Sequence, residues 1–420
     1  MIPRHALPVA LLGLMILGGA LAKLRFSLWI LGNCESAAPW HYLCADIGAW
    51  EQFLDSARVG IPYVDFTREY PAGAGSLFWL LGALTSADGF DGALRLQVAV
   101  SLVADLACAG LIFALARPFG ILRATAATAL WMCLPTVLLI SPVRYDSLVA
   151  VLLLAGYLAH RRGRPMWAVG LWSVGFTLKW YPVIAIAVQQ LAADRATMRR
   201  QLPRAMAVAV SVVAAVNAPY IIGDLARHGH VTHWLGTYTF HAERVLAPDT
   251  VLGVLELWLG PLPLERYAAL FSIGLGCLVL LTRRQLEWAP KVVLVCVALL
   301  VLNRIYSPQF NLWFMPPLLL TMAASSRSAF LVLASLVILI DIATIAIFPF
   351  LYAAVVFEIG EFPLGGAAAA GGPYTEAFTS AIFLRAFLLL ALMGVLYRIA
   401  PDVSAGLPGA AGDPRGPSRA

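Results

Sequence analysis

Residues 46–75 read DIGAWEQFLDSARVGIPYVDFTREYPAGAG, the longest run with several acidic residues in a chain where only 12% of residues are charged. The stretch follows the first long apolar segment of the chain. Its first part places apolar residues at helical spacing, with polar residues on the other faces. The apolar face starts just before the stretch, at Leu43, and continues with Ile47, Trp50, Leu54 and Ala57, while the other faces hold Asp46, Gln52, Asp55 and Ser56. This spacing predicts a short amphipathic helix that lies in a membrane interface.

The second part of the stretch brings acidic residues close to that helix. Gly60-Ile61-Pro62 ends the helix, and Asp65 and Glu69 follow before a turn at Pro71. With Asp46, they place three carboxylates at the membrane surface within about one loop. Two interpretations are open at this point: a reaction centre with Asp46, Glu69 and Asp65 as catalytic candidates, and a solvated linker with ordinary surface charge.

The composition is that of an integral helical membrane protein. Of 420 residues, 61% are hydrophobic, and the mean hydropathy is +0.82. A soluble domain could not bury so much apolar surface. The net charge of +6 is carried largely by short basic loops, which fits the positive-inside rule and not a nucleic-acid surface. We expect one polytopic membrane domain over residues 1–400, with a first outer loop at 24–70 and a disordered cytoplasmic tail at 401–420.

Apolar segments recur along the whole chain and predict an all-α bundle of roughly 10–13 transmembrane or re-entrant helices, of which the first, residues 6–22, is an uncleaved span. The others cover 71–86, 95–116, 124–142, 147–159, 165–193, 205–222, 265–282, 289–302, 309–323, 328–350 and 381–399. The basic clusters between them read as cytoplasmic. These clusters are Arg161-Arg162-Arg164, Arg195 with Arg199-Arg200 and Arg204, and Arg283-Arg284.

If Glu69 lies outside and Arg161 lies in the cytoplasm, the chain must cross the membrane an odd number of times between them. Four apolar segments separate the two residues. We therefore predict that 71–86 dips into the membrane and returns. Segment 165–193 is flanked by arginines on both sides, so we predict a helical hairpin with residues 179–182 at its outer turn.

Three further groups of polar residues lie at the ends of apolar segments. In SPVRYD, residues 141–146, Arg144 and Asp146 are costly at a membrane boundary unless they are paired or hydrated, which favours a functional role. The alternative is that they cap and orient the next helix. Lys179 either binds an anion such as a lipid phosphate or extends to the interface. Residues 303–317 read NRIYSPQFNLWFMPP, and they suit sugar recognition or form a proline-bent turn.

Histidines and cysteines give weaker signals. His228, His230, His233 and His241 share one polar loop, but their spacing lacks a zinc pattern and a firm third ligand. We therefore expect no metal and no cofactor. Cys34 and Cys44 would form a disulfide if the first outer loop faces an oxidising compartment. The remaining four cysteines lie in apolar spans and are interpreted as packing residues.

The order of these motifs resembles that of the polyprenol-phosphate-sugar-dependent α-mannosyltransferases of the GT-C superfamily. The outer-loop pattern G-x-P-Y-x-D-F-x-x-E-Y-P is matched by Gly60, Pro62, Tyr63, Asp65, Phe66, Glu69, Tyr70 and Pro71, while Ala72 replaces a usual second proline. HAERVLAPDT, residues 241–250, resembles the family's H-x-x-R-x-L-x-x-E-S, with Asp249-Thr250 in place of Glu-Ser. SPQFNLW, residues 307–313, resembles a further family signature.

The resemblance implies a membrane glycosyltransferase that moves a sugar, mannose or a related one, from a polyprenyl-phosphate donor to a lipid or polysaccharide acceptor on the outer face of the plasma membrane. A single displacement inverts the anomeric centre. We expect a carboxylate such as Asp46 to act as the base and Arg244, Lys179 and Arg304 to bind the donor phosphate. The sugar and acceptor candidates are Tyr63, Tyr70, Arg144, Asp146, His241, Gln309, Asn311 and Trp313. The alternatives are a secondary transporter or flippase of a lipid-linked or sugar substrate, and a structural membrane protein.

Overall fold

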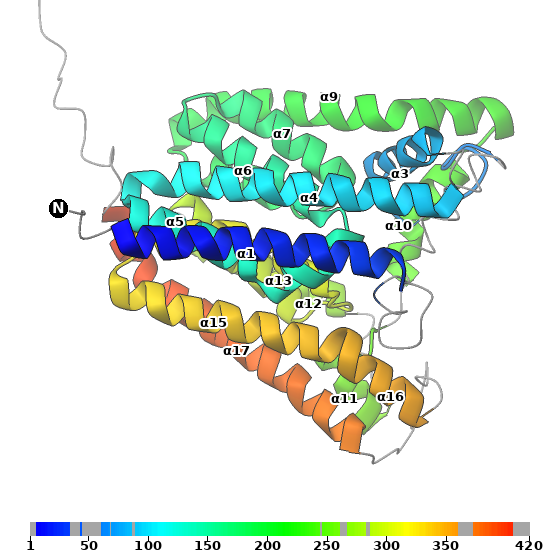
Figure 1. Ribbon diagram of the computed structural model, residues 1–420. Coiled ribbons are helices and arrows are strands. Elements are labelled where there is room, and N and C mark those ends of the chain that lie inside the picture. Colours follow the sequence, from blue (N-terminus) through cyan, green and yellow to red (C-terminus); the bar gives the residue numbers. More distant parts are fainter. Residues whose placement is uncertain are drawn as a thin grey trace, which may run out of the picture.

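The computed structural model describes residues 6–33, 43, 60–67, 69–85, 89–243, 246–260, 267–282, 286–359 and 373–405. Within these ranges the regular structure is helical, apart from one isolated bridge between Pro62 and Phe66 (Figure 1). The predicted all-α class is therefore confirmed. The amphipathic helix predicted before Gly60 lies outside the described residues, except for Leu43, which is fully buried.

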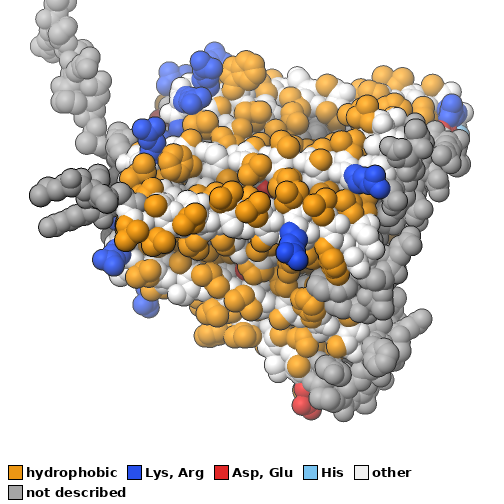
Figure 2. All heavy atoms as spheres, viewed as in Figure 1, with side chains coloured by type: hydrophobic (Ala, Val, Ile, Leu, Met, Phe, Trp, Pro, Cys, Tyr) orange, Lys and Arg blue, Asp and Glu red, His pale blue; other side chains and the backbone are white. Residues whose placement is uncertain are grey.

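Five described helices are long and apolar enough to cross a membrane. They are α1 (Ala6–Leu31), α4 (Gly89–Ala116) with η1 (Arg117–Phe119), α9 (Arg195–His228), α15 (Arg327–Ile345) with η6 (Ala346–Leu351) and α16 (Tyr352–Ile359), and α17 (Pro373–Ala405). Hydrophobic side chains cover the visible face of these helices (Figure 2). Exposed leucines on α1, such as Leu7 at 68% and Leu14 at 64%, are what a lipid-facing helix requires. The protein is therefore a multi-pass membrane protein.

Three hairpins of shorter helices fill the space between the long ones. The first runs from α5 (Ile121–Cys133) through η2 (Thr136–Ile140) and η3 (Ser141–Val143) into α6 (Asp146–Arg161), with a bend of 50° after α5. The second joins α7 (Pro165–Leu178) to α8 (Val183–Ala192), and the third joins α13 (Trp288–Val301) to α14 (Asn311–Ala324). The predicted hairpin over 165–193 is thus confirmed as two short helices with a break at 179–182.

The open ends of the three hairpins lie together at one end of the bundle. Gln189 near the end of α8 hydrogen-bonds His160 at the end of α6, with 3.1 Å between Nε2 and Nδ1. Arg123 in α5 donates to the carbonyl of Ala323 in α14. Lys and Arg side chains gather at this end, at the left of Figure 2, and we call it the basic end.

The turns of the hairpins lie inside the bundle, short of its opposite end. At a rise of about 1.5 Å per residue, α7 is about 21 Å long and α8 about 15 Å, whereas a membrane core is about 30 Å thick. The α7–α8 hairpin, which starts at the basic end, therefore turns at membrane depth, and α13 and α14, with 14 residues each, are too short to cross as well. Broken backbone is tolerated there only where protein buries it or where it lines a cavity.

The opposite end of the bundle holds short elements. α3 (Ala72–Leu84) has 13 residues, so it does not cross by itself, as predicted for 71–86. α4 then returns to the basic end and leaves one full crossing between Glu69 and Arg117 (Figure 1). α10 (Thr232–Glu243) and α11 (Val251–Leu259) lie at this end as well (Figure 1), whereas α12 (Ala268–Thr282) packs along α13 and η5 (Pro308–Phe310) lies in the turn between α13 and α14. α17 continues to Ala405, beyond the boundary expected at 401.

Candidate functional site

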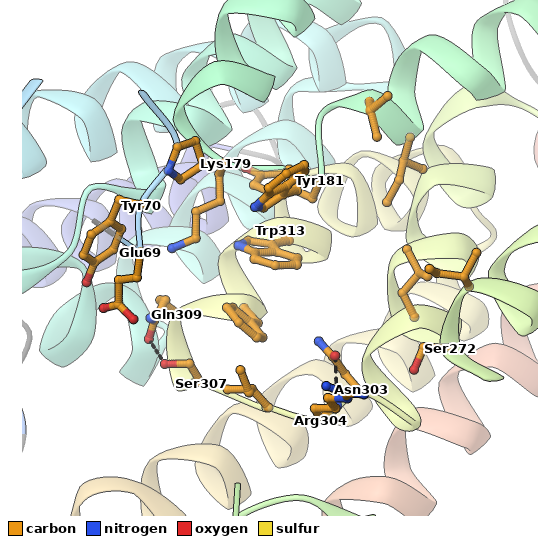
Figure 3. A pocket seen from close by; sticks show the side chains of 18 of the residues that line it. Glu69, Tyr70, Lys179, Tyr181, Ser272, Asn303, Arg304, Ser307, Gln309 and Trp313 are labelled. Carbon is orange, nitrogen blue, oxygen red and sulfur yellow. Dashed lines mark hydrogen bonds between the residues drawn. The ribbon is translucent and has the colours of Figure 1, made fainter. Parts of the chain in front are cut away.

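A cavity of about 510 Å³ opens where the turns of the three hairpins meet (Figure 3). Residues at the start of α6, between α7 and α8, and between α13 and α14 line it, together with the loop before α3 and part of α12. The lining residues are Glu69, Tyr70, Pro71, Tyr145, Lys179, Trp180, Tyr181, Val183, Ile184, Ser272, Ile273, Leu299, Asn303, Arg304, Ile305, Ser307, Gln309, Phe310 and Trp313. Six residues that the sequence predicts as site candidates therefore share one cavity: Glu69, Tyr70, Lys179, Arg304, Gln309 and Trp313.

Asp146 positions two side chains of the cavity from behind. It is the first residue of α6 and is fully buried. Its Oδ2 lies 3.3 Å from Nζ of Lys179, and its Oδ1 accepts a 2.9 Å hydrogen bond from Nε1 of Trp313. The Lys179 amine also lies 4.8 Å from the centre of the Tyr145 ring. Since an ammonium has three N–H donors, Lys179 keeps donors for an anion in the cavity.

Aromatic rings form one wall of the cavity. Tyr181 and Trp313 stack with their centroids 4.8 Å apart and an angle of 12° between their planes. Phe310 lies 4.1 Å from Trp313, tilted by 35°. Such a wall offers flat faces for the apolar side of a sugar ring or for a hydrocarbon chain.

Glu69 enters the cavity because the preceding loop is fixed. The Tyr63 hydroxyl donates to the carbonyls of Tyr70 and Pro71, at 2.8 and 3.1 Å, which holds the turn into α3. Tyr63 adopts a left-handed backbone with φ of 65°, and its ring is buried. Gly75 leaves room for it, since an added Cβ there would lie 2.1 Å from the hydroxyl oxygen.

The cavity separates its charged groups. Figure 3 shows Glu69 and Lys179 on one side, and Arg304 with Asn303 on another. The main chain of Arg304 is held at both ends: its N–H donates to Oδ1 of Asn303 at 2.9 Å, and its carbonyl accepts from Ala247 at 2.8 Å. Ser307 hydrogen-bonds Oε1 of Gln309.

Besides Asp146, four predicted site residues have structural partners instead of a place among the lining residues of the cavity. Tyr63 holds the turn into α3, and Arg144 is buried and donates to the carbonyls of Leu43 and Val143 at 3.2 and 2.9 Å. Asn311 donates to Asp341 at 2.9 Å and accepts from the Tyr306 hydroxyl at 2.7 Å.

Asp65, the fourth, is held by a loop contact with α9. It pairs with Arg227 and accepts from the main chain of Ile61 at 2.6 Å. The hydrogen bond from Arg227 lowers the pKa of the Asp65 carboxyl below its ordinary value. Asp65 therefore fastens the loop before Glu69 to the end of α9, and the geometry does not favour it as a base in the cavity.

Some predicted residues lie outside what the structure describes. Asp46, Arg244, Cys34 and Cys44 fall outside the described residues, and His241 lies in α10 without a described side chain. The structure in turn adds Tyr145, Tyr181 and Phe310, which are neighbours in sequence of the predicted Asp146, Lys179 and Gln309. Ser272 and Ile273 come from α12, where no sequence signal marked them.

No family model matches this chain, and no curated protein is similar to it in sequence.

Proposed function

We propose that this protein is a membrane glycosyltransferase that moves a sugar from a polyprenyl-phosphate donor to a lipid or glycan acceptor. One observation carries the proposal. A single cavity at membrane depth combines a carboxylate, two cations, stacked aromatic rings and an apolar wall that continues to the outside of the bundle. The motif resemblance supports mannose as the sugar and the outer face of the plasma membrane as its place.

The apolar wall suits a lipid-linked substrate. Val183 of α8 and Ile273 of α12 line the cavity, and they are also 46% and 55% exposed on the bundle. A polyprenyl chain can therefore lie across this wall while its phosphate enters the cavity. A soluble nucleotide sugar would need no such side entrance.

Lys179 and Arg304 supply the charge that a phosphate needs. Their charges are worth more at membrane depth than in water because the surroundings are poorly polarisable. The carboxyl of Asp146 holds Lys179 in place, and the cation completes its hydrogen bonds with the donor phosphate. Trp313 and Gln309 line the same cavity and would contact the sugar.

Glu69 is the base in this proposal, because it is the carboxylate among the described lining residues. It takes the proton of an acceptor hydroxyl, whose oxygen forms a bond to the anomeric carbon of the donor. The bond from that carbon to the phosphate oxygen breaks in the same step. The leaving polyprenyl phosphate gains one negative charge, which Lys179 and Arg304 stabilise.

The test uses purified protein in lipid nanodiscs with radiolabelled polyprenyl-phosphate mannose and lipid acceptors. The proposal predicts transfer of label to an acceptor, or slow hydrolysis of the donor, and loss of both in Glu69→Gln. Absence of transfer and hydrolysis across donor sugars and acceptors would contradict it.

The broken helices favour a second candidate, a transporter or flippase of a lipid-linked substrate. Transporters often place substrate sites at helix breaks near the middle of the membrane, and the three hairpins turn at such a depth. Proteoliposomes distinguish the two. Movement of labelled donor across the bilayer without transfer would favour the transporter.

A further inference from the structure

The far end of α9 and the start of α10 bring histidines together with a buried carboxylate, away from the cavity. Asp224 is fully buried, whereas the side chains of His230 and His233 are 50% and 29% exposed. One ligand atom from each of the three lies within 4.8 Å of the others. The histidine spacing alone lacked a third ligand, and Asp224 near the end of α9 supplies it because the turn into α10 brings His230 and His233 beside it.

The two oxygens of Asp224 have different surroundings. Oδ2 accepts the N–H groups of His233 and Trp234, at 3.0 and 3.3 Å, and so caps the first turn of α10. Oδ1 faces the imidazoles, at 3.0 Å from Nδ1 of His233 and 3.8 Å from Nδ1 of His230. The cap therefore fixes the carboxylate while leaving one oxygen directed at two potential ligands.

The spacing of these atoms suits a small tetrahedral ion. With ligand bonds of about 2.0–2.1 Å, neighbouring donor atoms of a tetrahedral zinc site lie about 3.3 Å apart. The separations of 3.0 and 3.8 Å from Oδ1 of Asp224 to the two Nδ1 atoms bracket this value, and all three ligand atoms lie within 4.8 Å of one another. Two imidazoles with one carboxylate favour Zn²⁺ or a similar transition ion over Mg²⁺ and Ca²⁺, which prefer oxygen ligands.

We propose that Asp224, His230 and His233 form a binding site for Zn²⁺ or a similar divalent transition ion, with water in the fourth position. On binding, the ion takes the place of the hydrogen bond between Nδ1 of His233 and Oδ1 of Asp224, and both imidazoles bind it in their neutral form. The exposed edges of the histidines give the ion access from solution.

An ion at this site would stabilise the turn between α9 and α10, against which the loop before Glu69 packs. His228 packs on both histidines, with ring centroids 5.0 Å from His233 and 5.7 Å from His230. Its Nε2 lies 3.6 Å from Asp65, which also pairs with Arg227. An ion that fixes the turn between α9 and α10 would thereby fix the surface on which residues 60–67 pack.

The experiment measures metal binding directly, on full-length protein purified without a polyhistidine tag. Zn²⁺ content is measured after gel filtration, and Co²⁺ binding is followed by its visible absorption. We expect one ion per chain, and loss of two ligands in His230→Ala/His233→Ala should weaken binding by ~100-fold or more, since even outer partners of a metal site contribute 10–100-fold. His5→Ala is the matched control, because His5 directly precedes α1, which starts at the basic end.

Folding of the variants is checked separately. His230→Ala alone removes a half-exposed side chain, so it should leave the gel-filtration profile unchanged. Zn²⁺ should raise the unfolding temperature of the wild type and of His5→Ala, and not that of His230→Ala. The proposal is overturned if the wild type retains no ion, or if folded His230→Ala and the double variant bind the ion as tightly as the wild type.

Discussion

Glu69 lines the cavity, and Asp65 does not. Glu69→Gln keeps size and hydrogen-bonding shape but removes basicity, so transfer should fall by ~10²-fold or more. Donor binding should change little. Glu287→Gln is the matched control, because Glu287 directly precedes α13 at the basic end. The measurement is initial transfer rate together with donor affinity.

Asp46 is the competing candidate for the base, because the sequence predicts that role and residue 46 lies outside the described residues. If Asp46→Asn abolishes transfer and Glu69→Gln does not, the base is assigned wrongly.

Lys179 is expected to bind the donor phosphate. Lys179→Ala should lower the affinity for the donor by about ten- to a hundredfold. This corresponds to the loss of charge-assisted hydrogen bonds that contribute about 1.5–3 kcal/mol. The single change also leaves the Asp146 carboxyl without its cation, which would lower stability.

Lys179→Ala/Asp146→Asn separates these two effects. The double variant should recover thermal stability without recovering donor affinity, as measured by binding of labelled donor. Recovery of affinity would show that Lys179 acts on Asp146 and not on phosphate.

At the scale of elements, the loop at 60–67 is fastened to α9 by a titratable contact. The pKa of Asp65 is lowered in the folded protein, first by the hydrogen bond from Arg227. A carboxyl with a depressed pKa stabilises the fold above its unfolded pKa of about 3.9, and this contribution is lost as pH falls through the lower folded value. Hydrogen exchange at 60–67, corrected for its intrinsic pH dependence, should therefore increase below about pH 4.

Arg227→Ala is the control for this contact. It should raise exchange at 60–67 at neutral pH and remove most of the acid-induced change. Unchanged exchange in this variant would mean that the ion pair does not hold the loop.

The sequence predicts helix breaks better than it predicts partners across the bundle. The break at 179–182 was predictable because arginines flank both ends of one apolar segment and a proline follows Lys179. The structural role of Asn311 was not, because its partner Asp341 lies 30 residues away in α15. Likewise, the position of Asp224 beside His233 depends on the turn between α9 and α10. A polar residue at a helix break looks the same in sequence whether it serves a ligand or a buried carbonyl.

At the scale of the whole molecule, the arrangement predicts which residues share a side of the membrane. Ile61, which is 46% exposed, and the exposed Thr239 lie at the end opposite the basic end. Arg162 is exposed and lies at the basic end. In a background without the six native cysteines, Ile61→Cys and Thr239→Cys should react with an impermeant thiol reagent from outside. Arg162→Cys should react only after permeabilisation. Labelling of Ile61→Cys and Arg162→Cys from the same side would contradict the single crossing by α4.

We propose that a lipid-linked sugar donor binds between the turns of the three hairpins. The most direct measurement is cross-linking with a photoreactive polyprenyl-phosphate sugar, followed by peptide mapping. We expect adducts within residues 179–184 and 299–313, which unlabelled donor prevents and Lys179→Ala reduces. Adducts confined to other parts of the chain, or adducts that unlabelled donor does not prevent, would contradict it.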